Sequence, residues 1–169
     1  MNLAVGTSRR EKRRDIHGRL NNLASTRFDP FARAFSRFHV RMNGTTVGRF
    51  LDRYFGAPVF QLTVRGRVSG APRSVMLMLT RRGEDIIVVG SNAGNAAEPN
   101  WFQNLRAAGA AQVRVGDQSW DASFRVLDGD ERRACWEIAL ENYPSFRTYQ
   151  ERTGRTIPVG LLVSKAAGN

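Results

Sequence analysis

The chain has 169 residues, a formal net charge of +11 at pH 7 and 41% hydrophobic residues. This length fits one domain, because a domain of about 150 residues buries roughly 70% of the surface that its unfolded chain exposes. The single cysteine, Cys135, excludes an internal disulfide, and the two histidines provide no spacing of metal ligands. No apolar run reaches the roughly 18 residues that a membrane span requires. We therefore expect a cytoplasmic protein without a metal site.

Positive charge is concentrated towards the N-terminal end. Residues 1–53 contain 12 basic and 4 acidic residues, which account for +8 of the net charge. Such a charge attracts nucleic acid, anionic lipid or an anionic small molecule, and Coulomb attraction alone does not distinguish among them. Residues 1–26 are polar and lack apolar periodicity, so we expect a basic mobile tail there.

Residues 27–55 are predicted to form an amphipathic helical segment. Apolar side chains fall at spacings of three and four, and arginines recur every four residues on another face. The apolar positions are Phe28, Phe31, Phe35, Phe38 and Met42, and the basic ones are Arg33, Arg37 and Arg41. Such a helix either contacts the inner face of a membrane peripherally through residues 28–42 or packs its phenylalanines on the domain. The second interpretation is favoured, because most apolar stripes are core faces.

Residues 56–166 are typical of a mainly β domain. Strands are predicted over 59–65, 73–80, 85–91, 112–115, 119–127 and 156–163, and helices over 98–107, 128–143 and 145–152. The first three strands are expected to form an antiparallel meander, and the last, which is continuously apolar, a buried central strand. Residues 128–131 resemble a capping box. About six mostly antiparallel strands with peripheral helices predict an α+β fold whose sheet closes into a small barrel and hides its edges.

The loop between the first two predicted strands is the strongest candidate site. Gly66 and Gly70 allow positive φ and close approach of the backbone to a ligand. Arg67 and Arg73 can make charge-assisted hydrogen bonds to phosphate or carboxylate. The loop matches neither a P-loop nor a G-x-G-x-x-G motif. It indicates either an anion site or a surface hairpin with solvated arginines.

Two further segments could carry chemistry. Residues 91–94, Ser-Asn-Ala-Gly, follow a predicted strand and present backbone N–H groups and a hydroxyl. Residues 143–149 place aromatic side chains at intervals of three, where they can wall an apolar pocket or pack in the core. No histidine or cysteine stands beside a nucleophile, and no carboxylate pair stands out. An enzyme with this sequence would therefore rely on a cofactor.

Taken in order, five motifs resemble the deazaflavin-dependent nitroreductase family over residues 59–163. They are G-R-x-S/T-G-x-P-R, a strand ending in Ser before a Gly, P-x-W-x-x-N-L, Y-P-S-aromatic-x-x-Y and R-T-I-P-V. The resemblance implies a split β-barrel that uses the deazaflavin coenzyme F420. It also implies hydride transfer to a planar, electron-poor acceptor such as a quinone, an enone or a nitroaromatic.

The resemblance also implies roles for individual residues. The cofactor would contact Arg67, Ser69, Gly70, Pro72, Arg73, Met76, Met78, Ser91, Asn92, Gly94, Trp101 and Asn104. Arg67, Ser69 and Arg73 would hold its anionic tail, and the methionines would lie along its ring. The substrate would contact Met78, Tyr143, Phe146 and Tyr149, and the catalytic residues would be Ser91, Tyr143 and Tyr149. From local pattern alone, Trp101 and the aromatic set are also consistent with core packing.

The sequence departs from the family pattern at Val68, where many relatives carry a second cation, and at Met76, Met78 and Phe146. An FMN-binding split-barrel reductase therefore stays an alternative, as does a non-enzymatic, membrane-peripheral ligand-binding protein. The chain lacks a stacking platform or recognition helix, so specific nucleic-acid binding is not expected. A homodimer is one possible assembly.

Overall fold

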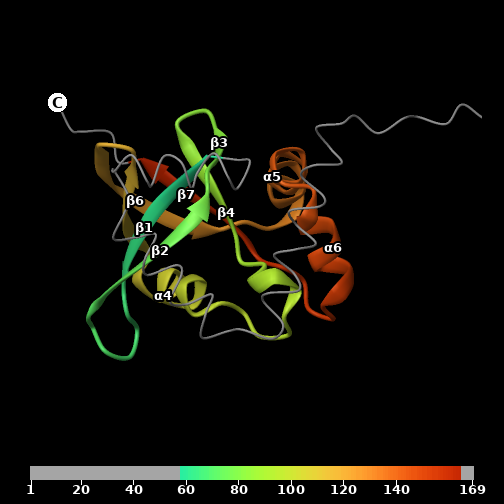
Figure 1. Ribbon diagram of the computed structural model, residues 1–169, viewed down its shortest axis with the longest axis horizontal. Coiled ribbons are helices and arrows are strands. Elements are labelled where there is room, and N and C mark those ends of the chain that lie inside the picture. Colours follow the sequence, from blue (N-terminus) through green and yellow to red (C-terminus); the bar gives the residue numbers. More distant parts are fainter. Residues whose placement is uncertain (1–57, 165–169) are drawn as a thin grey trace, which may run out of the picture.

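The computed structural model describes residues 58–164, so the predicted tail 1–26 and the helical segment 27–55 lie outside the described residues. The strands are β1 (Val59–Arg65), β2 (Pro72–Met78), β3 (Thr80–Arg82), β4 (Asp85–Val89), β5 (Ala110–Val115), β6 (Gln118–Val126) and β7 (Val159–Ser164). The helices are η1 (Asn92–Gly94), α4 (Asn100–Ala108), α5 (Gly129–Asn142) and α6 (Ser145–Arg152). Figure 1 shows a curled sheet with α5 and α6 on one side and α4 near one end.

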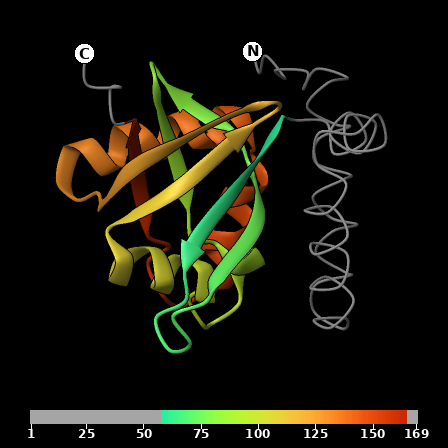
Figure 2. The ribbon, with the colours of Figure 1, turned by 90° about the vertical axis from the view of Figure 1, so that its left-hand side faces the viewer.

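All seven strands form one antiparallel sheet in the order β2-β1-β5-β6-β7-β4-β3. The two edge strands, β2 and β3, are consecutive in the chain and are separated only by Leu79. Because one residue joins the two edges, the sheet must curl until they meet, which gives the predicted mainly β barrel (Figure 2).

The predicted pairings of the first three strands are confirmed, but the middle strand is interrupted. The residues expected to form one strand over 73–80 divide into β2, which pairs with β1, and β3, which pairs with β4. The division occurs at Leu79, where the chain crosses from one edge of the sheet to the other. This raises the strand number from the six expected to seven. The predicted central position of the last strand is confirmed, since β7 lies between β6 and β4.

Alternation along the strands creates two apolar cores on opposite faces of the sheet. In β1 the buried residues are Phe60, Leu62 and Val64, as the period of two requires. They belong to the inner core, which α4 completes with Phe102 and Leu105. The outer core lies between β4, β7, α5 and α6. It includes Ile87, Cys135, Ala139, Phe146, Tyr149, Ile157 and Leu161.

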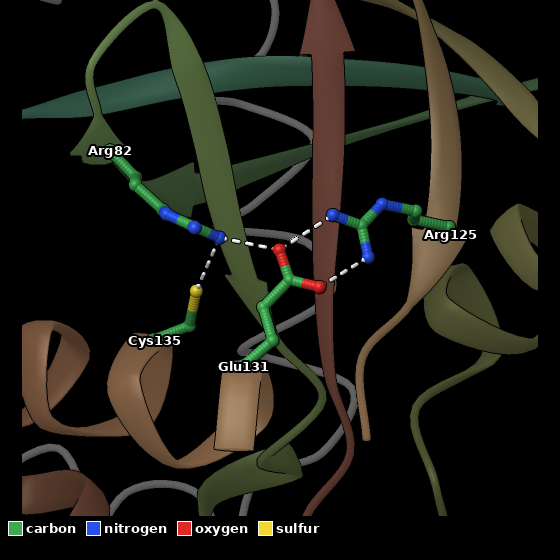
Figure 3. Close-up of polar contacts among 4 residues, drawn as sticks. All are labelled: Arg82, Arg125, Glu131 and Cys135. Atoms are coloured by element: carbon green, nitrogen blue, oxygen red, sulfur yellow. Dashed lines mark hydrogen bonds and ion pairs between the residues drawn. The ribbon is translucent and has the colours of Figure 1, made fainter. Parts of the chain in front are cut away.

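The predicted capping box at the start of α5 is wrong. Asp128 is the N-cap residue, but its side chain makes no capping hydrogen bond. Glu131 turns instead to two arginines: its Oε1 lies 2.6 Å from Nη1 of Arg82 on β3, and its Oε2 lies 2.6 Å from Nη1 of Arg125 on β6 (Figure 3). The stronger attraction of a carboxylate for two guanidinium groups explains this choice. Glu131 thus links two strands to one helix.

Within residues 58–164, no helix is long and apolar enough to cross a membrane. The same residues contain no group of three or more His, Cys, Asp or Glu side chains that could hold a metal ion.

Candidate active site

The loop that joins β1 and β2, residues 66–71, is compact and internally hydrogen-bonded. The Gly66 N–H donates to the carbonyl of Ala71 at 2.9 Å, and the Gly70 N–H donates to the carbonyl of Gly66 at 2.8 Å. Gly70 has φ of 68°, the left-handed conformation that glycine adopts at least cost. Arg73 Nη2 donates to Ser69 Oγ at 3.3 Å. The loop therefore presents its polar groups from a defined backbone.

Arg67 fastens this loop to α4. Its backbone N–H and its Nη1 both donate to Oδ1 of Asn104, at 3.2 and 2.9 Å. Its Nη2 donates to Oδ1 of Asn100 at 3.3 Å. Asn104 is only 8% exposed, so its amide acceptor is held in place by the packing of the helix. The structure thus brings together two residues that the sequence assigned to the same ligand, although they lie 37 positions apart.

Three arginines give the loop its positive charge: Arg65, Arg67 and Arg73. Arg65 lies over the loop, with Nη2 3.7 Å from the position that a Cβ on Gly70 would occupy. Among residues 58–164, none of the three forms an ion pair with a carboxylate. Their donors and charge thus fit a polyanionic group such as the tail of a phosphorylated cofactor.

Residues 91–94 form a turn with an unusual backbone. Asn92 and Ala93 have φ of 47° and 53°, values that residues other than glycine rarely adopt. The Asn92 side chain donates from Nδ2 to the carbonyl of Ala97 at 2.9 Å. Gly94, with φ of 80°, is buried against the backbone of Tyr149 on α6. Strained backbone of this kind is concentrated at functional sites.

Sequence reasoning gave no role to Arg155, whose guanidinium donates to three backbone carbonyls of the segment around this turn. Arg155 opens the R-T-I-P-V motif, but backbone carbonyls exist at every position, so the sequence does not indicate which groups its side chain contacts.

Trp101, predicted to support the cofactor, is partly buried at the start of α4. Its ring meets that of Phe102 edge to face at 5.3 Å and packs against the inner core. Phe102 is fully buried, and its ring lies 3.0 Å from where a Cβ on Gly90 would stand. Trp101 therefore lies between the core and the surface that carries the loop.

The predicted aromatic set forms one cluster at α6. The hydroxyl oxygens of Tyr143 and Tyr149 lie 3.3 Å apart, and the ring of Phe146 meets that of Tyr143 edge to face at 5.1 Å. Phe146 and Tyr149 are 7% and 3% exposed and belong to the outer core, whereas Tyr143 is half-buried. Burial raises the pKa of Tyr149 well above its ordinary value, so its phenol keeps its proton at neutral pH.

Met76 and Met78 lie on a different surface from the inner core. They pair with Gln61 and Val59 of β1, while the intervening Leu77 faces the core. Ser74, on the same face as the methionines, shares a hydrogen bond of 2.8 Å with Thr63. The methionines are half-buried on this outer face of the sheet. Contact between them and a cofactor ring stays a prediction.

The curled antiparallel sheet, with a basic loop docked on one helix and a left-handed turn docked on another, defines a split-barrel protein with a positively charged loop at its surface. The solved structure of an F420-H2 dependent reductase is 35% identical and has a TM-score of 0.59, covering 62% of this chain and 93% of that chain. A structure described as a domain-swapped dimer is 32% identical with a TM-score of 0.59, covering 69% of this chain and 92% of that chain.

Sequence comparison identifies the family within this class. The model of the family described as F420H(2)-dependent quinone reductase matches residues 31–164. A protein of Mycobacterium tuberculosis named F420H(2)-dependent quinone reductase is 31% identical over 134 residues, which cover 76% of this chain and 89% of that protein. The chain belongs to the F420H(2)-dependent quinone reductase family. This membership confirms the predicted resemblance and favours F420 over the FMN alternative.

Proposed function

We propose that this chain is an F420-dependent oxidoreductase that reduces a planar, electron-poor acceptor of the quinone class. The observation that carries the proposal is the pairing of Arg67 with Asn104 and Asn100, which holds the guanidinium of the loop against α4. No carboxylate of residues 58–164 neutralises the positive charge of the loop. Family membership supplies the identity of the anionic ligand.

The loop residues would hold the anionic tail of the cofactor. Arg67 and Arg73 are already oriented by Asn104 and Ser69, so binding an anion does not require them to be ordered first. Arg65 adds a third positive charge beside Gly70. The exposed Val68 at the loop tip contributes no charge, and Arg65 would supply the additional cation in its place.

The turn at residues 91–94 would border the reactive part of the cofactor. When bound in its reduced form, F420 supplies the hydride for the reaction. Ser91 is half-buried at the start of this turn, where its hydroxyl can orient a polar group of the ligand.

The two tyrosines would supply a proton donor. Tyr149 is buried and keeps its proton, so it can donate to the hydroxyl oxygen of Tyr143. Tyr143 is then free to donate its own proton to an acceptor oxygen on the half-buried side of the cluster. The interior tyrosine thereby sets the orientation of the outer one.

Fluorescence titration of the full-length chain with oxidised F420 tests the proposal. We expect Arg67→Ala and Arg73→Ala each to raise the Kd for F420 by about tenfold, because each variant loses the charge-assisted hydrogen bonds of one guanidinium. Arg133→Ala is the control, because Arg133 is an exposed arginine of α5 that pairs with Asp130. Tight binding of FMN with no binding of F420 would overturn the proposal.

The acceptor is tested with the reduced coenzyme in excess. We expect oxidation of the coenzyme to be accelerated by a soluble naphthoquinone and to show saturation with quinone concentration. If the protein binds F420 but does not reduce quinones, the proposed acceptor class is wrong and only the proposed cofactor stands.

We also propose that two copies of the chain pair. Support comes from the 32% identical structure described as a domain-swapped dimer, whose length is 92% covered by the match. Size-exclusion chromatography with light scattering should give twice the chain mass of 18.9 kDa. A monomer mass at all concentrations would overturn this assembly.

For residues 28–42, which lie outside the described residues, we propose peripheral contact with the inner face of a membrane. The support is the separation of phenylalanines and arginines onto two faces of the predicted helix, and packing of the phenylalanines on the domain is the other outcome of the test. The family match begins at residue 31, so substitution is a better test than deletion. Phe31→Asp with Phe35→Asp should reduce sedimentation with anionic vesicles and preserve F420 binding; unchanged sedimentation would refute the contact.

A further inference from the structure

The turn at residues 91–94 needs support from outside itself. Asn92 and Ala93 both adopt left-handed backbone conformations, and Gly94 N–H donates to the Ser91 carbonyl at 3.0 Å. Neighbouring contacts must offset the cost of two such residues in succession. The internal bonds from Asn95, whose N–H and Nδ2 both reach the Asn92 carbonyl, hold only one side of the turn.

Arg155 forms hydrogen bonds with the backbone at both ends of the turn. Its Nη2 donates to the carbonyls of Gly90 and Ser91, at 3.0 and 2.9 Å, where the chain enters the turn. Its Nε donates to the carbonyl of Asn95 at 3.2 Å, just after it. One planar guanidinium thus fixes the distance between the entry and the exit of the turn.

The backbone of Arg155 is itself held by α6. Gln150 donates from Nε2 to the Arg155 carbonyl at 2.9 Å, and the same side chain accepts from the Ile157 N–H at 2.9 Å. Arg155 therefore links the helix that carries Tyr149 to the turn that packs on it.

Among residues 58–164, Arg155 has no ion-pair partner. Burial is the main influence on its pKa and lowers it, and the nearby carboxylate of Glu98 acts in the opposite direction. Nη1 of Arg155 and Oε1 of Glu98 are both buried, and neither has a hydrogen-bond partner among residues 58–164. The guanidinium donors of Arg155 that are engaged all point to the backbone of the segment around the turn.

We propose that Arg155 is a positioning residue that holds residues 91–94 in the conformation that binds the cofactor. This inference rests on the proposed function, since it assigns the turn to the cofactor site. Lysine cannot replace it fully, because a single ammonium nitrogen cannot reach carbonyls on both sides of the turn with the fixed geometry of a guanidinium.

The test compares Arg155→Met, Arg155→Lys and the control Arg147→Met in the full-length chain. Arg147 is an exposed arginine of α6, so its replacement changes the charge equally. Hydrogen exchange without cofactor is the first measurement. In Arg155→Met, peptides covering residues 90–97 should exchange about tenfold faster, while peptides covering β1 and β5 keep their protection.

Cofactor affinity and kinetics are the second measurement. We expect the Kd for F420 and the KM for reduced F420 to rise about tenfold in Arg155→Met, by an intermediate factor in Arg155→Lys, and less than about twofold in Arg147→Met. The kcat at saturating coenzyme should change less than KM, because Arg155 is not assigned to the reacting groups.

Unchanged exchange at residues 90–97 together with an unchanged Kd in Arg155→Met would overturn the inference. If Arg155→Met does not fold, Arg155→Lys decides by the same criteria. A wild-type protein that fails to bind F420 contradicts the proposed function instead, and the exchange measurement still reports whether Arg155 holds the turn.

Discussion

Gly94 and Tyr149 are in backbone contact: a Cβ on Gly94 would stand 2.9 Å from the carbonyl oxygen of Tyr149. This contact joins the turn proposed to bind the cofactor to the helix that carries the proposed proton donors. The two parts of the site therefore have a fixed separation that no side chain can adjust.

Replacement of Gly94 by alanine tests this contact. The new methyl group meets backbone atoms and requires φ of 80°, so we expect a loss of about 3 kcal/mol in the free energy of unfolding. Gly109→Ala is the matched control, because Gly109 has φ of 66° and open surroundings, and should lose only about 1 kcal/mol. Urea denaturation measures both. Equal losses would show that the contact with Tyr149 has no energetic weight.

Asn104→Asp should change stability and affinity in opposite directions. The new carboxylate still accepts from Arg67 and adds an ion pair, so the melting temperature should stay the same or rise. Its charge competes with an anionic ligand for Arg67, so the Kd for F420 should rise about tenfold and depend less on salt. Gln118→Glu, which adds the same charge at an exposed position of β6, should leave both unchanged. A tighter complex in Asn104→Asp would contradict anion binding by Arg67.

The tyrosine pair should show a graded effect on turnover. Tyr143→Phe removes the proposed proton donor and should lower kcat about a hundredfold. Tyr149→Phe removes only the group that orients it and should lower kcat about tenfold. Stopped-flow oxidation of reduced F420 by a quinone measures both rates, and the Kd for the coenzyme should not change. A larger effect of Tyr149→Phe would reverse the two assigned roles.

Glu131 should make stability depend on acid pH. Hydrogen bonds from Arg125 and Arg82 lower its pKa from 4.5 to about 2. Because the pKa is lower in the folded state, the carboxylate stabilises the fold above pH 4.5, and this contribution is lost as pH falls towards about 2. Glu131→Gln should therefore lower the melting temperature by a few degrees at pH 7 and converge with the wild type in acid. A difference that persists unchanged at pH 2 would indicate lost packing and not lost charge.

Much of the fold was predictable because local pattern and tertiary structure agree. β1 and α6 have the predicted bounds, since each has flanking turn residues and a clear period. The break at Leu79 was not predictable, because Met76 to Thr80 is uniformly apolar up to its last residue and barrel closure alone decides where the chain crosses. The position of Glu131 likewise depends on arginines 49 and 6 residues away.

The candidate site also combines features that the sequence predicts with features that only the structure shows. Residue type and glycine spacing indicated an anion site or a solvated hairpin at Arg67 and Arg73, the family resemblance added Ser69, and the structure shows which partner orients each arginine. The contacts of Arg155 are invisible in sequence because all its acceptors are backbone carbonyls. Phe146 was consistent with either substrate contact or core packing from its pattern, and the structure places it in the outer core, while contact with a substrate stays a prediction.

The single-residue link at Leu79 limits how this barrel can vary. Each added residue there would shift the alternation of β3 against β4 and exchange its inward and outward side chains. At the turns of Gly83 and Gly116, a Cβ would meet no atom of the described chain within 4 Å, so we expect extra residues there to be accommodated better than at Leu79. New loops acquired by this chain can therefore enlarge the ends of the barrel, while the crossing at Leu79 must keep its length.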